Sequence, residues 1–134
     1  MIQNYQKQMK VIHSSDLQLV PAAHEDPLDP GVLKKVLFKR DDFDEGQVVV
    51  VNWSVLPKGK SFAFHYHESL QEVFVIFKGK VKAVVDNQEV ILESGDALIA
   101  DKNEKHSMQN IAEEDVVFLM FGISDNPNGK TVNV

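Results

Sequence analysis

Two histidines separated by a single residue are the part of this sequence most suited to chemistry. His65 and His67 flank Tyr66, and Glu72 follows five residues after His67. On a helix, side chains at that spacing point about 200° apart, whereas on a strand they share one face and can reach one metal ion. Because the chain contains no cysteine, a metal must take histidine and carboxylate ligands. A metal site is therefore our first hypothesis.

Glu72 and His106 extend this hypothesis. A turn through Glu68–Leu70 can fold Glu72 back beside the histidine pair. A buried carboxylate without a partner is unfavourable, and a divalent cation is an effective partner for it. His106 lies on a separate strand candidate, and these considerations alone leave open whether it joins the same ion.

The spacing of these residues resembles the two motifs of the cupin superfamily, over about half of the chain. The first motif is matched at every defined position by Gly59-x5-His65-x-His67-x4-Glu72-x6-Gly79, and the second is matched in part by Gly95-x5-Asp101-x-Asn103-x2-His106-x3-Asn110. Asp101 and Asn103 stand where the family usually has proline and glycine. Asparagine tolerates the left-handed conformation, so we expect the turn before His106 to survive.

The resemblance implies an all-β fold, a single-domain conical β-barrel or jelly-roll-like double-stranded sheet. It implies that His65, His67, Glu72 and His106 gather on one divalent transition metal ion inside it. This ligand set suits Fe, Mn, Ni, Co, Cu or Zn and does not choose among them. The resemblance also implies a homodimer, formed by adding an N-terminal strand to the neighbour's sheet.

Three functions remain open for such a site. The chain can be a metal-dependent oxygenase, such as a dioxygenase, or a redox-neutral isomerase or lyase. We expect one of these two, acting on a small organic molecule that the sequence does not identify. The alternative is a module that binds or senses a metal or a small ligand without turnover.

The residues around the metal ligands are predicted from strand alternation. The pocket-wall candidates are Ala63, Phe74, Ile76, Met108 and Asn110. Phe62, Phe64 and Tyr66 are expected on the opposite face. Asp101 is the one candidate for a general base, with a solvated turn carboxylate as the competing interpretation. His13 and His24 are expected to be surface residues.

Short strands with turn signals between them predict one antiparallel β domain. The expected strands are residues 32–38, 47–56, 61–67, 71–77, 80–85, 88–92, 96–100, 105–110 and 116–122, and Asp86-Asn87 is expected to form a tight hairpin. We assign residues 1–38 to an N-terminal arm with a short strand that can be exchanged in a dimer, residues 39–124 to the barrel and residues 125–134 to an exposed tail.

Composition limits the partners. The chain has 134 residues and a formal net charge of −6, which argues against nucleic acid because phosphate recognition needs a basic face. No stretch approaches the ~18–20 apolar residues of a membrane span, and no signal peptide is evident. A small molecule, bound by a cytoplasmic protein, is the expected partner.

Overall fold

The computed structural model describes residues 9–43, 45–126 and 128–134. The strands in these residues are β1 (Val20–Pro21), β2 (Leu33–Lys39), β3 (Val48–Leu56), β4 (His65–His67), β5 (Gln71–Lys78), β6 (Lys80–Val85), β7 (Gln88–Glu93), β8 (Ala97–Ala100), β9 (His106–Asn110), β10 (Val116–Ile123) and β11 (Thr131–Asn133). Two 3-10 turns, at Ser14–Asp16 and Arg40–Asp42, complete the regular structure.

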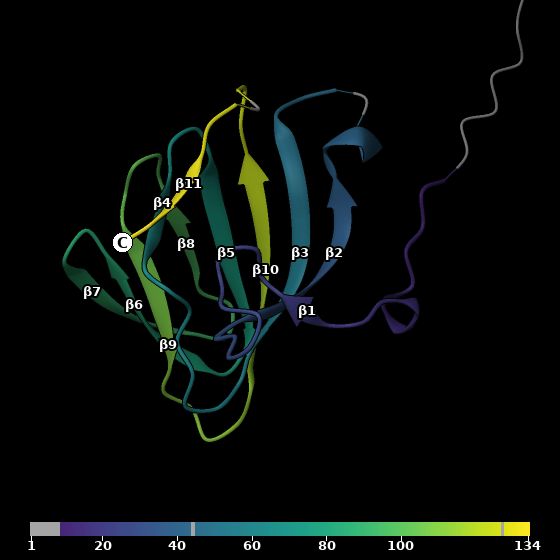
Figure 1. Ribbon diagram of the computed structural model, residues 1–134. Helices are drawn as coiled ribbons and strands as arrows, with labels where there is room; N and C mark the ends of the chain where they lie inside the picture. Colours follow the sequence, from purple (N-terminus) through teal and green to yellow (C-terminus); the bar gives the residue numbers. More distant parts are fainter. Residues whose placement is uncertain (1–8, 44, 127) are drawn as a thin grey trace, which may run out of the picture.

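The strands form two antiparallel sheets (Figure 1). One sheet has the order β1-β2-β3-β10-β5-β8, and the other has the order β11-β4-β9-β6-β7. The predicted all-β, cupin-like double sheet is confirmed, although the two sheets do not close into a continuous barrel. No helix in the described residues is long and apolar enough to cross a membrane.

Local sequence explains the turns that set the register. Asp86 and Asn87 have φ of 44° and 68°, the left-handed values that a two-residue hairpin needs, and they join β6 to β7 with Val85 opposite Gln88. Asn103 has φ of 63°, so it supplies the conformation that glycine would otherwise provide before His106. The turn is retained, and β9 begins at His106, one residue after the expected start.

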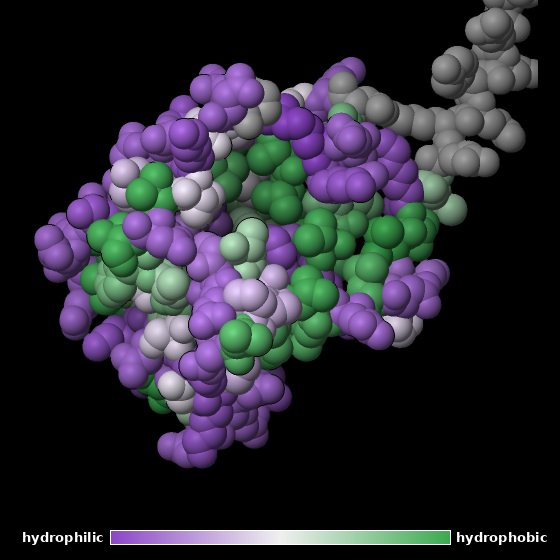
Figure 2. All heavy atoms as spheres, viewed as in Figure 1, coloured by the Kyte–Doolittle hydropathy of each residue, from purple (hydrophilic) through white to green (hydrophobic). Residues whose placement is uncertain are grey.

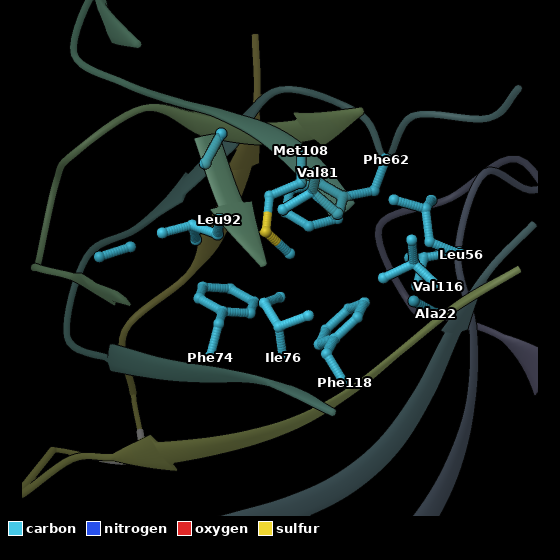
Figure 3. Close-up of a cluster of buried hydrophobic side chains, with 13 residues drawn as sticks. Ala22, Leu56, Phe62, Phe74, Ile76, Val81, Leu92, Met108, Val116 and Phe118 are labelled. Carbon is cyan, nitrogen blue, oxygen red and sulfur yellow. The ribbon is translucent and has the colours of Figure 1, made fainter. Parts of the chain in front are cut away.

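The hydrophobic core lies between the sheets (Figure 3). Along β5, alternate side chains are buried, which places Glu72, Phe74 and Ile76 on the inner face. Phe74 and Ile76 face Met108 of the opposite sheet. The same alternation that builds the core therefore carries the carboxylate of Glu72 into the interior.

Segments from both the N-terminal and the C-terminal part of the described chain join the sheets. β2 pairs with β3, and β1 pairs with β2. At the other end, β11 pairs with β4, with Thr131 opposite His67. An exposed tail was expected for these last residues, but Thr131–Asn133 complete the edge of the five-stranded sheet. The domain limits 1–38, 39–124 and 125–134 stay a prediction.

Candidate metal centre

The structure brings four potential metal ligands together from three strands. His65 and His67 come from β4, Glu72 from β5 and His106 from β9. His65 and His106 are paired across the sheet, so their side chains share one face. One ligand atom from each of the four residues lies within 4.8 Å of the others, in a group that could hold a metal ion.

The carboxylate of Glu72 is the centre of this group. Its Oε1 atom lies 2.6 Å from His67 Nε2, 2.9 Å from His106 Nε2 and 3.7 Å from His65 Nε2. Glu72, His65 and His106 are buried. Neighbouring donors at about 2.1 Å from one ion lie roughly 3 Å apart, which is close to the two shorter separations.

The outer nitrogen of each imidazole has a partner that orients the ring. His65 Nδ1 lies 2.7 Å from Ala63 O, and His106 Nδ1 lies 2.8 Å from Glu104 O. A carbonyl oxygen only accepts hydrogen bonds, so in both residues Nδ1 carries the proton. His67 Nδ1 lies 2.8 Å from the hydroxyl of Thr131. When their rings are neutral, His65 and His106 therefore turn an Nε2 lone pair toward Glu72, as metal-ligating histidines do.

Two of these inner nitrogens have no partner that satisfies them. His65 Nε2 and His67 Nε2 are buried and form no hydrogen bond with any described residue. A lone pair facing a carboxylate is unfavourable unless a proton or a cation lies between them. The donor set, the fixed ring orientation and the unsatisfied nitrogens all fit a divalent transition metal ion.

The pKa shifts of Glu72 and His106 in the metal-free site also fit a bound cation. Burial by itself raises the pKa of Glu72, but the hydrogen bond from His106 and the contacts with His65 and His67 outweigh it and hold that pKa well below its usual range. Burial lowers the pKa of His106, but the hydrogen bond and charge of Glu72 outweigh burial and raise it. Without a metal, a proton on His106 neutralises the carboxylate.

A fourth histidine, His24, lies beside the three histidines of the cluster, and this placement differs from the expectation. His24 was expected on the surface, but its side chain is only 16% exposed and its ring stacks on His65 with centroids 3.9 Å apart. Burial, followed by the neighbouring His65, lowers the pKa of His24 to about 3. The prediction was wrong because the residues next to His24 in the sequence do not indicate that its loop folds back onto His65.

Two contacts position that loop. The buried carboxylate of Glu25 accepts hydrogen bonds from the backbone N–H groups of Gly31, Val32 and Ala63. The Asn133 side chain donates a hydrogen bond to His24 O, at 3.2 Å. The backbone of residues 31, 32 and 63 and the side chain of Asn133 therefore hold the loop of His24 over the site.

A cavity of about 410 Å³ opens beside the cluster. His24, His65, His67 and Glu72 all line it. Its other lining residues are Ala22, Ala23, Val32, Lys34, Val50, Asn52, Ser54, Phe62, Leu70, Phe74, Phe118, Met120, Thr131 and Asn133. Figure 2 shows the molecule hollowed near the middle of the face in view, with hydrophobic residues between hydrophilic margins. The volume suits a small organic molecule.

Most of the predicted pocket walls lie elsewhere. Of the five candidates, Phe74 lines the cavity. Ile76 and Met108 belong to the hydrophobic core, and Ala63 lines a second, more open depression. Asn110 is buried where its side chain donates to Leu56 O and Glu114 O, so it ties a loop rather than facing a ligand. Strand alternation gave the correct face for Phe74, Ile76 and Met108, but it did not give the depth of each residue between the two sheets.

The alternation of faces that was expected over residues 61–67 holds only within β4. Phe62 was expected to point away from the histidines, but it is 3% exposed and packs edge-on against His65 with centroids 5.6 Å apart. The reason is that β4 begins only at His65, so the period of two does not extend back to Phe62. Asp101 is exposed and bonded to Gln71 and to the backbone of Lys102, not to the cluster.

Comparisons with known proteins agree with this architecture. Residues 52–122 match the family model described as "Cupin domain". An oxalate-binding protein from Thermotoga maritima is 33% identical over 64 residues, which cover 48% of this chain and 53% of that protein. A quercetin 2,3-dioxygenase from Bacillus subtilis is 40% identical over 63 residues, covering 47% of this chain and 18% of the enzyme. The match thus spans about half, or less, of these curated relatives.

Solved structures show the same fold. The crystal structure of a predicted oxalate decarboxylase from Thermotoga maritima superposes with a TM-score of 0.74 at 24% identity, covering 86% of this chain and 99% of that one. At this identity the likeness supports the fold alone.

Proposed function

The chain belongs to the cupin family, and on that premise we propose that it is a metalloenzyme that acts on a small organic molecule in the cavity beside Glu72. One divalent transition metal, among Fe, Mn, Ni, Co, Cu and Zn, is held by His65, His67, Glu72 and His106. The observation that carries this proposal is the pair of unsatisfied Nε2 atoms turned toward a buried carboxylate.

The residues of the chain divide the work of such a site. The backbone acceptors of His65 and His106 keep both rings in the orientation that ligation requires. Phe62, Phe74 and Phe118 give the cavity an apolar wall that excludes water from bound substrate. A bound dication would supply Lewis-acid stabilisation of negative charge or, as iron, one-electron chemistry with dioxygen.

Two reaction classes fit this arrangement. An oxygenase needs no further acid or base from the protein. A redox-neutral isomerase or lyase needs a group that moves a proton near the ion. Among the described lining residues, His24 has a neutral imidazole and is not a proposed metal ligand. His24 therefore replaces Asp101 as the candidate general base.

A binding module without turnover is the second candidate. It is favoured by the name of one sequence relative, an oxalate-binding protein. In that case the same four metal-binding residues and the same cavity bind a small molecule, and no reaction follows.

Elemental analysis of protein purified without a chelating tag, followed by oxygen-consumption assays of the iron-loaded form, tests the proposal. Stoichiometric metal with substrate-dependent oxygen uptake supports the oxygenase. Metal without uptake, but with conversion of a substrate in a screen of small organic acids, supports the redox-neutral enzyme. A loaded protein that binds ligands but converts none overturns the enzymatic proposal in favour of the binding module.

We further propose that the protein is a homodimer. The edge of the six-stranded sheet, β1 and β2, carries the exposed apolar side chains of Val20 and Val36, and Leu19 precedes it. Exposed edge strands are suited to pairing with another chain. Sedimentation at micromolar concentration is expected to give a species of twice the 15.1 kDa of one chain. A single 15.1 kDa species would contradict this.

A further inference from the structure

Lys34 is a cation directed into the cavity from β2, in the same sheet as the strand of Glu72 and in the sheet opposite His65, His67 and His106. In β2 it is paired with Ser54 of β3, which is in turn paired with Phe118 of β10. Cross-strand partners share a face, and Ser54 and Phe118 are buried on the inner face. Lys34 therefore projects inward, and it lines the same cavity as Glu72.

The ammonium group of Lys34 has no close counter-ion. Within the described residues Lys34 forms no hydrogen bond or ion pair, although Glu72 is near enough for its charge to be felt. Burial lowers the pKa of Lys34, and Glu72 opposes that shift in part. A partly buried cation without a partner is unfavourable, so an anion entering the cavity would be stabilised there.

Charge balance strengthens this requirement. Among the described residues that line the cavity, two belong to the charged types Lys, Arg, Asp and Glu. These are Lys34 and Glu72. A divalent ion bound at Glu72 would leave two excess positive charges facing the enclosed space. An anionic ligand compensates them better than a neutral one.

Asn52 adds a second polar anchor on the same wall. It is opposite Val36 of β2 and Met120 of β10. It lies two residues before Ser54 along β3, so both side chains take the same face of the strand. Asn52 is 3% exposed, and its Oδ1 atom is buried with no hydrogen-bond partner in the described part of the chain. A buried carbonyl oxygen of this kind needs a donor, and a hydroxyl group of a ligand would supply one.

We propose that the cavity binds a small hydroxylated organic acid, with a carboxylate of the ligand on Lys34 Nζ and a hydroxyl donating to Asn52 Oδ1. This inference rests on the proposed function, because it places the ligand beside the metal held by Glu72. It names the substrate class of that site. The two anchors lie on β2 and β3, whereas the four metal ligands lie on β4, β5 and β9.

Calorimetric titration of malate into the zinc-loaded protein tests the carboxylate anchor. Lys34→Met keeps the length of the side chain but removes its charge, and it is expected to weaken malate binding by about tenfold to a hundredfold. Lys35→Met is the matched control. Lys35 is on the same strand, and its Nζ bonds to Ser14, so this variant changes net charge equally and is expected to bind malate as the wild type does.

The hydroxyl anchor is tested by comparing malate with succinate, which lacks the hydroxyl. Asn52→Leu is expected to weaken malate binding by about fivefold to tenfold and to leave succinate binding unchanged. Circular dichroism and thermal melts of each variant show whether the fold is kept. If Asn52→Leu does not fold, the malate-to-succinate preference of the wild type is the deciding measurement, because the proposal requires tighter binding of malate.

The same titrations on metal-free protein separate the two proposals. Failure of the wild type to take up zinc contradicts the proposed metal function, while the dependence of malate binding on Lys34 is still measured. Zinc uptake with equal malate affinities for wild type and Lys34→Met overturns the inference and leaves the metal site standing. A wild type that binds no malate in either form also overturns it.

Discussion

Replacing His67 by alanine is expected to weaken the binding of a divalent metal by at least about a hundredfold while the fold stays intact. Loss of a supporting partner outside the ligand shell already costs about 10–100-fold in other metal sites, and a ligand contributes more. His67 Nε2 lies 2.6 Å from Glu72 Oε1, the shortest of the three contacts to this carboxylate. Its side chain is 12% exposed at the edge of the cluster, so its removal leaves the core unchanged.

His13→Ala provides the matched control for this variant. His13 is exposed, outside the cavity, and its loss changes the histidine count by the same amount. Metal titration followed by calorimetry should leave this control at wild-type affinity. If His67→Ala folds and binds metal as tightly as the control does, His67 is not a ligand and the proposed coordination is wrong.

Metal affinity is expected to fall steeply with pH, the second large effect. A ligating imidazole must be neutral, so a proton and the metal compete for each ring. The pKa of His106 is raised in the metal-free protein, so His106 holds a proton up to a higher pH than an ordinary histidine does. Affinity should drop by about tenfold per pH unit over the range in which His106 takes up the proton that the metal must displace.

Titrations between pH 8 and pH 4 measure this dependence. His24 does not contribute to the slope, because its pKa is lowered to about 3 and it stays neutral through this range. Protein that retains its full metal content down to pH 4 would contradict coordination by neutral imidazoles.

Three of the four central residues could be predicted because each depends on a short-range rule. The spacing of His65 and His67 needs only the period of a strand, and Glu72 needs one turn. His106 was reached through the resemblance of its motif, and its turn depends on Asn103 accepting a positive φ. The all-β fold followed from strand and turn signals that are local in the same way.

The other side of the cavity could not be predicted because it depends on contacts between distant segments. His24 reaches His65 only because Glu25 and Asn133 hold its loop over the site. Lys34 lies in β2, and nothing in the residues around it connects that strand with Glu72. No periodic pattern in the sequence indicates where His24 and Lys34 lie in the fold, and neither residue is near the motifs that carry the metal ligands.

Phe62 and Met108 show the limit of alternation as a guide. Alternation tells which face a side chain takes while the strand lasts, and β4 is too short to include Phe62. Met108 takes the inner face, as expected, but it lies in the hydrophobic core rather than at the cavity wall. Depth along the barrel depends on how the two sheets are stacked, which is a property of the tertiary structure.

X-ray absorption at the metal edge, combined with elemental analysis of protein loaded with zinc or iron and then dialysed, tests the central claim most directly. We expect one ion per chain, with nitrogen scattering from three imidazoles and at least one oxygen neighbour, as His65, His67, His106 and Glu72 would give. A loaded protein that retains much less than one ion per chain, or an ion surrounded only by oxygen, would contradict it.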